Sequence, residues 1–405
     1  MSITTRKFLE EAALTKEIID RFLDPNAHNW ATFDAELGYV LHNSTVKDGL
    51  DGSYSIYRYH PSGERRLLNF AEQPCRINTY GDSFTQCHQV SDGETWQEYL
   101  AAHLGEPIRN FGVGGYGIYQ AYRRMLKEET KSSAEYVILN IWSDDHFRSI
   151  YKWRWIHIPG YRRNLPQKNI SKTEACMFHA NPWAHLRLNP ESGEFEECEN
   201  PYSTPESLYQ LCDKEHIYEN FKDDFEVQAF LAQQNVTDIK IEILQRMAEV
   251  LEIPADFSSP EATAKTAQAL LRECAFRASM YIVDKAKAFA KTEGKKFMIL
   301  LSYSSGDVIN ACKNIPRFDQ LFVNYLKENE FLFVDVLQKH VEDFKVFNCS
   351  PEEYVQRYYI GHYNPNGNHF FAFAVKNDIV KWLEPKPPTY REEGPSLQTL
   401  AAKLA

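Results

Sequence analysis

The sequence predicts an α/β protein in which a long, mainly helical insertion interrupts a parallel sheet. Over residues 75–142, short apolar segments alternate with helical segments, an alternation typical of a parallel, doubly wound sheet. Residues 134–142 form a nearly continuous apolar run, which fits a strand covered on both faces. The alternation stops near residue 151 and returns over 295–383, so one sheet is expected to receive strands from both sides of the insertion.

The individual elements follow in chain order. Residues 1–23 read as an amphipathic helix, and residues 24–74 are turn-rich. Within the insertion, helices are expected at about 222–250 and 261–292. For the sheet region, the sequence predicts strands at 75–80, 107–113, 134–142, 295–303 and 331–337, and helices at 93–104, 116–129, 318–329 and 367–383.

These elements divide the chain into five segments. We expect an N-terminal helix and approach segment, the first part of the α/β core, an insertion or cap, the second part of the core, and a C-terminal tail. The corresponding ranges are 1–74, 75–150, 151–290, 291–385 and 386–405.

Composition excludes several classes of function. The net charge of −11, from 45 basic and 56 acidic side chains, disfavours a nucleic-acid partner, which normally selects a basic face. The eight cysteines include no CxxC pair, so neither a zinc ribbon nor a disulfide scaffold is indicated. The N-terminus lacks the apolar core of a signal peptide, and no run of about 18 apolar residues occurs. We therefore expect a cytoplasmic protein with reduced thiols and no membrane contact.

Three short stretches carry candidate chemistry. Gly81-Asp82-Ser83 follows the strand at 75–80, where a serine can be a nucleophile or simply cap a helix. The glycines of NFGVGGYG, at 110–117, follow the next strand and could bind a phosphate or present N–H groups to an oxyanion. His362 lies in a turn before the last helix, where it could be a catalytic base or a surface histidine.

Taken together, and in this order, the three stretches resemble the SGNH (GDSL) hydrolase superfamily over roughly 75–150 and 295–383. The resemblance implies a flavodoxin-like three-layer α/β/α sandwich. It also implies that Ser83 is the nucleophile and His362 the base. The backbone N–H groups of Ser83 and Gly115 would form the oxyanion hole.

The sequence departs from the family pattern at two positions. Asp144 stands where the family has an asparagine that donates to the oxyanion, and an ionised carboxylate can only accept. Asp144 is therefore expected to be protonated, to turn away, or to serve another purpose. Tyr359 stands where the family has an aspartate three residues before its histidine, and the nearest upstream acids are Glu352 and Glu353. No triad acid is assigned.

Further residues near these stretches are candidates for substrate binding. We expect Asp82, Trp142, Asp145 and Arg154 to contact the substrate. The aromatic and basic segment 151–163, with Arg154, Arg162 and Arg163, could clamp an anionic group or form a solvated cap surface. The adjacent Asp144, Asp145 and His146 are a weak metal signal, and neither a metal nor another cofactor is expected. Cys87 and His88 are interpreted as pocket wall.

The predicted function is a serine-dependent hydrolase that acts through an acyl-enzyme on a small-molecule ester with a small acyl group. One alternative is an acyltransferase of the same fold, in which an alcohol replaces water. The other is a binding protein that has lost catalytic power, as the changes at Asp144 and Tyr359 suggest. A homo-oligomer is possible.

Overall fold

The computed structural model describes residues 3–27, 29–160, 179–234 and 236–391. At its centre lies a five-stranded parallel sheet with the spatial order β6-β5-β7-β10-β11. In chain order this is 2-1-3-4-5, the flavodoxin-like order. The parallel, doubly wound sheet that the sequence pattern predicted is confirmed, as is the flavodoxin-like fold that the family resemblance implied. The strands are β5 (Ile77–Tyr80), β6 (Arg109–Asn110), β7 (Tyr136–Trp142), β10 (Lys296–Ser302) and β11 (Phe333–Asp335).

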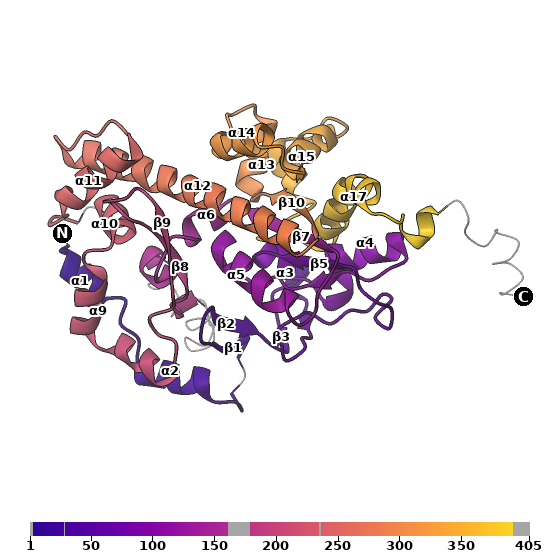
Figure 1. The fold of residues 1–405 in the computed structure, drawn as a ribbon, viewed down its shortest axis with the longest axis horizontal. Coiled ribbons are helices and arrows are strands. Elements are labelled where there is room, and N and C mark those ends of the chain that lie inside the picture. The colour runs from indigo at the N-terminus through magenta and orange to yellow at the C-terminus, as the bar shows by residue number, and fades with distance from the viewer. Residues whose placement is uncertain (1–2, 28, 161–178, 235, 392–405) are drawn as a thin grey trace, which may run out of the picture.

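Helices cover both faces of the sheet (Figure 1). Along the sheet, the chain passes from β5 to β6 toward one edge. From β6 to β7, and again from β7 to β10, it passes toward the opposite edge. Since such crossovers are right-handed, their helices fall on opposite faces. One layer contains α5 (Ile118–Glu129) and α12 (Pro260–Thr292), which contact each other; the other contains α4 (Trp96–Leu104) and α17 (Pro365–Trp382), with α15 (Val336–Phe344) against α17.

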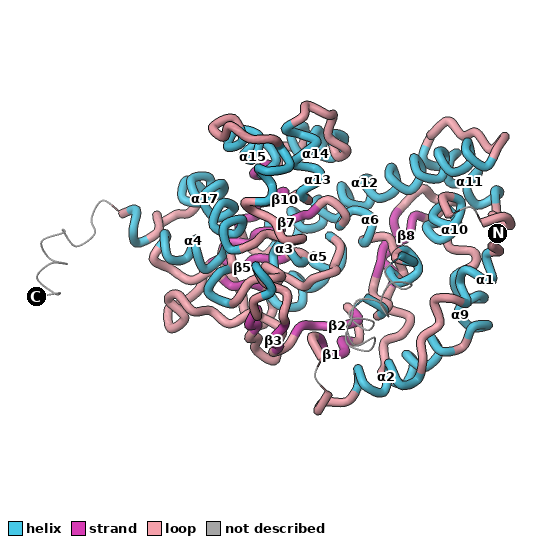
Figure 2. The backbone as a smooth tube through the Cα atoms, turned by 180° about the vertical axis from the view of Figure 1, so that it is seen from behind, coloured by secondary structure: helices cyan, strands magenta, loops and turns pink. Residues whose placement is uncertain are grey.

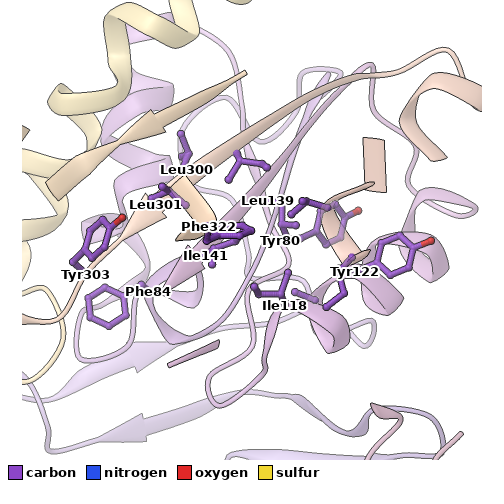
Figure 3. Close-up of a cluster of buried hydrophobic side chains, with 14 of the residues drawn as sticks. Tyr80, Phe84, Ile118, Tyr122, Leu139, Ile141, Leu300, Leu301, Tyr303 and Phe322 are labelled. Carbon is purple, nitrogen blue, oxygen red and sulfur yellow. The ribbon is translucent and has the colours of Figure 1, made fainter. Parts of the chain in front are cut away.

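The main hydrophobic core fills the space between these layers (Figure 3). All residues of β7 up to Ile141 are buried, because helices cover this central strand on both sides. Aromatic rings from the strand ends join the core, and Tyr80 stacks on Phe111 with 5.1 Å between ring centroids. This packing fixes the carboxyl ends of β5 and β7, from which the candidate site is built.

A second hydrophobic core joins the N-terminal segment to the predicted insertion. Phe8 and Tyr39 pack in it with Trp153 and Trp183. The two segments also bond directly, because the Leu14 N–H donates to the Leu211 carbonyl at 2.9 Å. Figure 2 shows α1 beside α9, and α2 contacts the 3-10 helix Glu206–Cys212. The N-terminal segment and the cap therefore form one packed layer beside the sheet.

The remaining elements are short. The N-terminal segment contains α1 (Thr5–Glu10), α2 (Lys16–Leu23) and the hairpins β1 (Ala31–Asp34) with β2 (Gly38–Leu41) and β3 (Ser44–Val46) with β4 (Ser55–Tyr57). The segment between β7 and α12 contains α6 (Asp145–Arg148), a 3-10 turn (Arg154–His157), β8 (His185–Leu188), β9 (Phe195–Cys198), α9 (Lys214–Phe221), α10 (Phe225–Ala232) and α11 (Ile241–Leu251). The rest are α3 (Ser83–Gln86), α13 (Ser305–Cys312), α14 (Gln320–Glu328) and α16 (Pro351–Gln356).

Several predicted boundaries were wrong. The helix expected over 1–23 is two helices separated at 11–15. The one expected over about 222–250 is also two helices, α10 beginning at Phe225 and α11 at Ile241. The strand expected over 331–337 ends at Asp335, because the Asp335 carboxylate accepts the Leu337 N–H at 3.2 Å and begins α15. None of the helices that the structure describes is long and apolar enough to cross a membrane.

Candidate active site

Ser83 lies in a tight turn between β5 and α3. Gly81, at φ 155°, has no room for a side chain, because a Cβ there would lie 2.1 Å from Thr85 Oγ1 and 2.5 Å from the Asn140 carbonyl oxygen. Asp82 caps the helix by accepting the Phe84 N–H at 2.8 Å. Ser83 is therefore the first residue of α3 rather than its cap. Its Oγ lies 3.2 Å from Asp82 Oδ2 and also contacts another partner.

That partner is His362, from a turn 279 residues further along the chain. The distance between Ser83 Oγ and His362 Nε2 is 2.8 Å. The turn is held on the helix side by Asn364, which caps α17 by accepting the Gly367 N–H at 2.9 Å. Phe84 contacts the imidazole, with ring centroids 5.1 Å apart. The structure thus brings together the two residues that the sequence singled out for nucleophile and base.

Gln89 orients the imidazole from the other side, and sequence reasoning missed it. Its Oε1 accepts both the backbone N–H of His362 at 2.8 Å and the ring Nδ1 at 3.1 Å. Its Nε2 donates to the Asp48 carbonyl at 3.0 Å. Since a backbone N–H can only donate and a carbonyl can only accept, these contacts fix the orientation of the amide. Nδ1 must then carry the proton, which leaves the lone pair of Nε2 facing the Ser83 hydroxyl.

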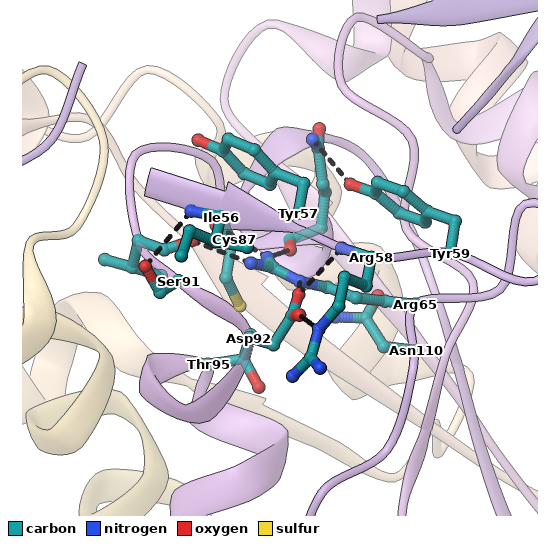
Figure 4. A network of polar contacts seen from close by, with 12 residues as sticks. Ile56, Tyr57, Arg58, Tyr59, Arg65, Cys87, Ser91, Asp92, Thr95 and Asn110 are labelled. Carbon is teal, nitrogen blue, oxygen red and sulfur yellow. Dashed lines mark hydrogen bonds and ion pairs between the residues drawn. The ribbon is translucent and has the colours of Figure 1, made fainter. Parts of the chain in front are cut away.

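A buried arginine holds the loop that carries Gln89 (Figure 4). The Arg65 guanidinium donates to the carbonyls of Gln86, Cys87 and Val90 at 2.5, 3.0 and 2.7 Å, and to Asp92 at 3.0 Å. Within this loop Cys87 and Gln89 adopt φ values of 60° and 73°. Such values are uncommon for residues other than glycine and persist where the surroundings determine them.

The environment of His362 favours its neutral form. Burial, with the nearby charges of His88 and Arg148, holds the pKa of His362 well below its usual range. His88 lies beside the imidazole, with ring centroids 4.9 Å apart, and faces Asp48 at 3.2 Å. A histidine that is neutral at physiological pH can accept the serine proton.

The glycine loop packs directly on α3. A Cβ on Gly112 would lie 2.1 Å from the Gln86 nitrogen, so no other residue fits there. The Gly114 N–H donates to Gln86 Oε1 at 2.9 Å. Gly115 adopts φ 91°, and a Cβ on it would lie 2.5 Å from Tyr39 Oη and 2.9 Å from Arg154 Nη1. Within the part of the chain that the structure describes, the Gly115 N–H makes no hydrogen bond.

Three of the predicted site residues surround Arg148 instead of forming an open surface. Its guanidinium lies 3.7 Å from Asp82, 2.9 Å from Asp144 and 3.1 Å from Asp145. Asp82 and Asp145 are 0% and 1% exposed. The sequence predicted that both would contact the substrate, but in the structure their carboxylates are buried against Arg148 and support the turn. Burial raises the pKa of both.

Asp144 follows β7. Its carboxylate is bound by Arg148 Nε, and its side chain is 48% exposed. Trp142 stacks on Phe84 with 5.2 Å between ring centroids and lies under Arg148. Arg154 reaches the glycine loop, whereas Arg162 and Arg163 lie outside the described residues. Cys87, interpreted as pocket wall, is 2% exposed.

Similarity to known proteins adds little to this geometry. The sequence matches no known protein family and no curated protein. The structure is similar to that of LAE5, an alpha/beta hydrolase enzyme from the metagenome of Lake Arreo, Spain, with a TM-score of 0.30 and 13% sequence identity. The match covers 74% of this chain and 91% of that chain. At this level the similarity supports no inference about chemistry.

No group of three or more His, Cys, Asp or Glu side chains in the described ranges is arranged to hold a metal ion. At the site, the described residues bring together a serine hydroxyl, an oriented neutral imidazole and the N–H groups of a glycine loop. All lie at the carboxyl ends of β5, β6 and β7, where the strand order reverses. In doubly wound sheets this is the usual place of the ligand site.

Proposed function

We propose that this protein is a serine-dependent ester hydrolase of the SGNH (GDSL) type that acts on a small acyl ester. The observation that carries the proposal is the 2.8 Å contact between Ser83 Oγ and His362 Nε2, with the imidazole in the tautomer that accepts a proton. A nucleophile, a base and an orienting group in line are the signature of nucleophilic catalysis.

The reaction follows from these positions. Ser83 Oγ attacks the ester carbonyl carbon while its proton passes to His362 Nε2. The N–H groups of Ser83 and Gly115 stabilise the negative oxygen of the tetrahedral intermediate. When the intermediate collapses, the alcohol leaves with the proton from His362. A water molecule, deprotonated by the same imidazole, then attacks the acyl-serine and releases the carboxylic acid.

The direct test is covalent labelling of the intact protein with a fluorophosphonate, combined with hydrolysis of 4-nitrophenyl acetate. The label should attach to Ser83, and Ser83→Ala should remove both labelling and turnover. His362→Ala should lower turnover by about 10²–10⁴, as expected for a lost general base. An unlabelled, inactive wild-type protein would instead support the binding-protein alternative.

Added alcohol separates hydrolysis from acyl transfer. A hydrolase should release free acid at the same rate when glycerol or a sugar is present. Accumulation of the new ester in place of the acid would identify an acyltransferase with the same Ser83 chemistry.

A further inference from the structure

One positive charge beside the glycine loop has no use in the mechanism above. Arg154 begins the 3-10 turn Arg154–His157, directly after the segment that follows β7 and α6. Its Nη1 lies 2.9 Å from the position that a Cβ on Gly115 would occupy. The same nitrogen contacts His179 Nδ1 at 3.1 Å. The guanidinium is thus held against the glycine whose N–H is assigned to the oxyanion.

Arg154 forms no direct ion pair with any of the residues that the structure describes. No carboxylate of the described residues lies within 4 Å of its guanidinium, whereas neighbouring Arg148 has three. Burial and the like charge of Arg148 lower the pKa of Arg154 to about 10, so the side chain stays cationic at neutral pH. Burying a cation without a carboxylate partner is unfavourable. An anionic ligand would offset that cost for Arg154, which has no such partner among the described residues.

The carboxylates nearest the site are already engaged elsewhere. Asp82, Asp144 and Asp145 contact Arg148, and Asp48 faces His88. Among the described residues around the site, Arg154 is therefore an arginine without a directly paired carboxylate. Guanidinium groups bind carboxylates through paired N–H donors.

We propose that Arg154 binds a carboxylate of the substrate, so that the substrate class is an ester carrying a carboxylate close to the scissile carbonyl. The proposal rests on the proposed function for the identity of the reacting bond. The carboxylate can belong to the acyl group, as in a monoester of a dicarboxylic acid, or to the alcohol, as in an acylated hydroxy acid.

Matched substrates test the proposal. The anionic mono-4-nitrophenyl succinate and the neutral 4-nitrophenyl butyrate have acyl chains of similar length, and O-acetylglycolate places the carboxylate on the alcohol. Arg154→Gln should lower kcat/KM about 10- to 100-fold, the value of a hydrogen bond to a charged group, on at least one anionic ester. Hydrolysis of the butyrate should change less than about threefold.

The anionic ester whose hydrolysis falls in Arg154→Gln shows whether the carboxylate bound by Arg154 belongs to the acyl group or to the alcohol. Arg187→Gln is the matched control, because Arg187 is an exposed arginine paired with Glu196, and it should leave all three substrates unaffected. Equal losses on neutral and anionic esters in Arg154→Gln would overturn the proposal and assign Arg154 to the oxyanion hole or to the fold. The proposal would also be overturned if the wild type hydrolysed the anionic and the neutral esters with comparable kcat/KM and Arg154→Gln changed none of these values.

A binding experiment separates this proposal from the proposed function. Succinate titrated into Ser83→Ala by calorimetry should bind, and the affinity should fall at least about tenfold in Ser83→Ala/Arg154→Gln. Binding that depends on Arg154 in a protein that hydrolyses no ester would support the anion subsite while rejecting the hydrolase. Absence of succinate and acetylglycolate binding in Ser83→Ala would reject the subsite even if butyrate is hydrolysed by the wild type.

Discussion

Gln89 occupies the position in which serine hydrolases commonly carry a carboxylate. A triad acid fixes the histidine tautomer and stabilises the imidazolium. The Gln89 amide fixes the tautomer through its 3.1 Å contact with Nδ1. Because the amide is neutral, it contributes little to stabilising the imidazolium. The proposed mechanism therefore has a well-oriented but weakly basic imidazole, which fits the lowered pKa of His362.

The pH dependence of wild-type hydrolysis should reflect this weak base. His362 works in its neutral form, so kcat/KM falls as pH decreases through its pKa. Because that pKa lies well below the usual histidine range, activity should be constant from neutral pH to below about 6.5, the unperturbed value. Profiles of kcat/KM against pH for 4-nitrophenyl butyrate measure the effect. An acidic limb centred at or above the unperturbed value would contradict the assignment.

Substitution of Gln89 should move that limb. In Gln89→Glu a carboxylate faces Nδ1, which raises the pKa of His362, and the acidic limb should shift to higher pH. Gln89→Ala should reduce kcat by about 10–100-fold, with little change in KM. This is less than the 10²–10⁴ of a lost general base, because the imidazole itself remains. The same profiles measure both variants, and Gln320→Ala, at an exposed glutamine of α14, is the control. A Gln89→Ala enzyme with wild-type kcat would show that Gln89 does not position the base.

The Asp144 carboxylate is bound by Arg148 and 48% exposed, so it should not enter the oxyanion hole. Asp144→Asn retains an oxygen that can accept from Arg148. We expect less than about a threefold change in kcat/KM on neutral esters, in contrast to the 10²–10³ effect of an oxyanion donor. Steady-state kinetics of this variant decide the point. An increase above tenfold would place Asp144 inside the hole.

Sequence reasoning found the residues of the site that lie in recognisable local patterns. Ser83, Gly115 and His362 each follow a strand or precede a helix in a short motif, and the structure places Ser83 and His362 in contact. It missed Gln89, because the loop that brings Gln89 to His362 is folded around Arg65, and the QCHQV stretch at 86–90 contains no local signal of that contact. An orienting acid was therefore sought only just upstream of His362. It also missed Arg148, because the carboxylates that Arg148 binds come together only in the folded protein.

At the scale of elements, the glycine loop and α3 determine each other's position. Gly112→Ala should destabilise the protein by about 1–3 kcal/mol or more, as for an overpacked core. The added Cβ would lie 2.1 Å from a backbone nitrogen of α3, which cannot move without displacing Ser83. Turnover should fall with stability. Thermal unfolding and 4-nitrophenyl butyrate hydrolysis measure the two effects.

Gly306→Ala provides the control for this substitution. Gly306 is in α13, and the nearest atom to a Cβ on it would be 3.6 Å away. It should leave the melting temperature and the rate close to wild type. Similar melting temperatures for Gly112→Ala and Gly306→Ala would mean that the loop is not packed against α3 as described.

The elements themselves were predictable where the pattern was long and periodic. β7, β10, α12 and α17 begin and end within about two residues of the predicted ranges. The short strands were less predictable, and β6 ends at Asn110, three residues before its predicted end. Side-chain caps also decide the ends of short elements, as Asp335 does where β11 ends and α15 starts. The division of the chain into a core and an insertion stays a prediction, although α12, from the end of that insertion, contacts β10 directly.

For the whole molecule, the two hydrophobic cores meet at the glycine loop. The first core carries β5 and α3 with Ser83. The second contains Tyr39, whose hydroxyl donates to the Gly114 carbonyl at 2.7 Å, and it lies beside the turn that carries Arg154. The N-terminal segment therefore holds the glycine loop through the second core, at the residue next to Gly115. No local pattern in the sequence could reveal this dependence, since it arises from contacts between residues 75 positions apart.

Tyr39→Phe removes only the hydroxyl that donates to the Gly114 carbonyl, and so tests whether Tyr39 positions the glycine loop. The ring still fills the second core, but the buried Gly114 carbonyl loses its donor, which should cost about 1–3 kcal/mol of stability. If Tyr39 positions Gly115, kcat should fall while KM stays constant, because the oxyanion donor acts in the transition state. Tyr54→Phe, at a 64% exposed tyrosine, is the matched control for both measurements. A stability loss with unchanged kcat would mean that the second core supports the fold of the cap but does not set the geometry of the oxyanion loop.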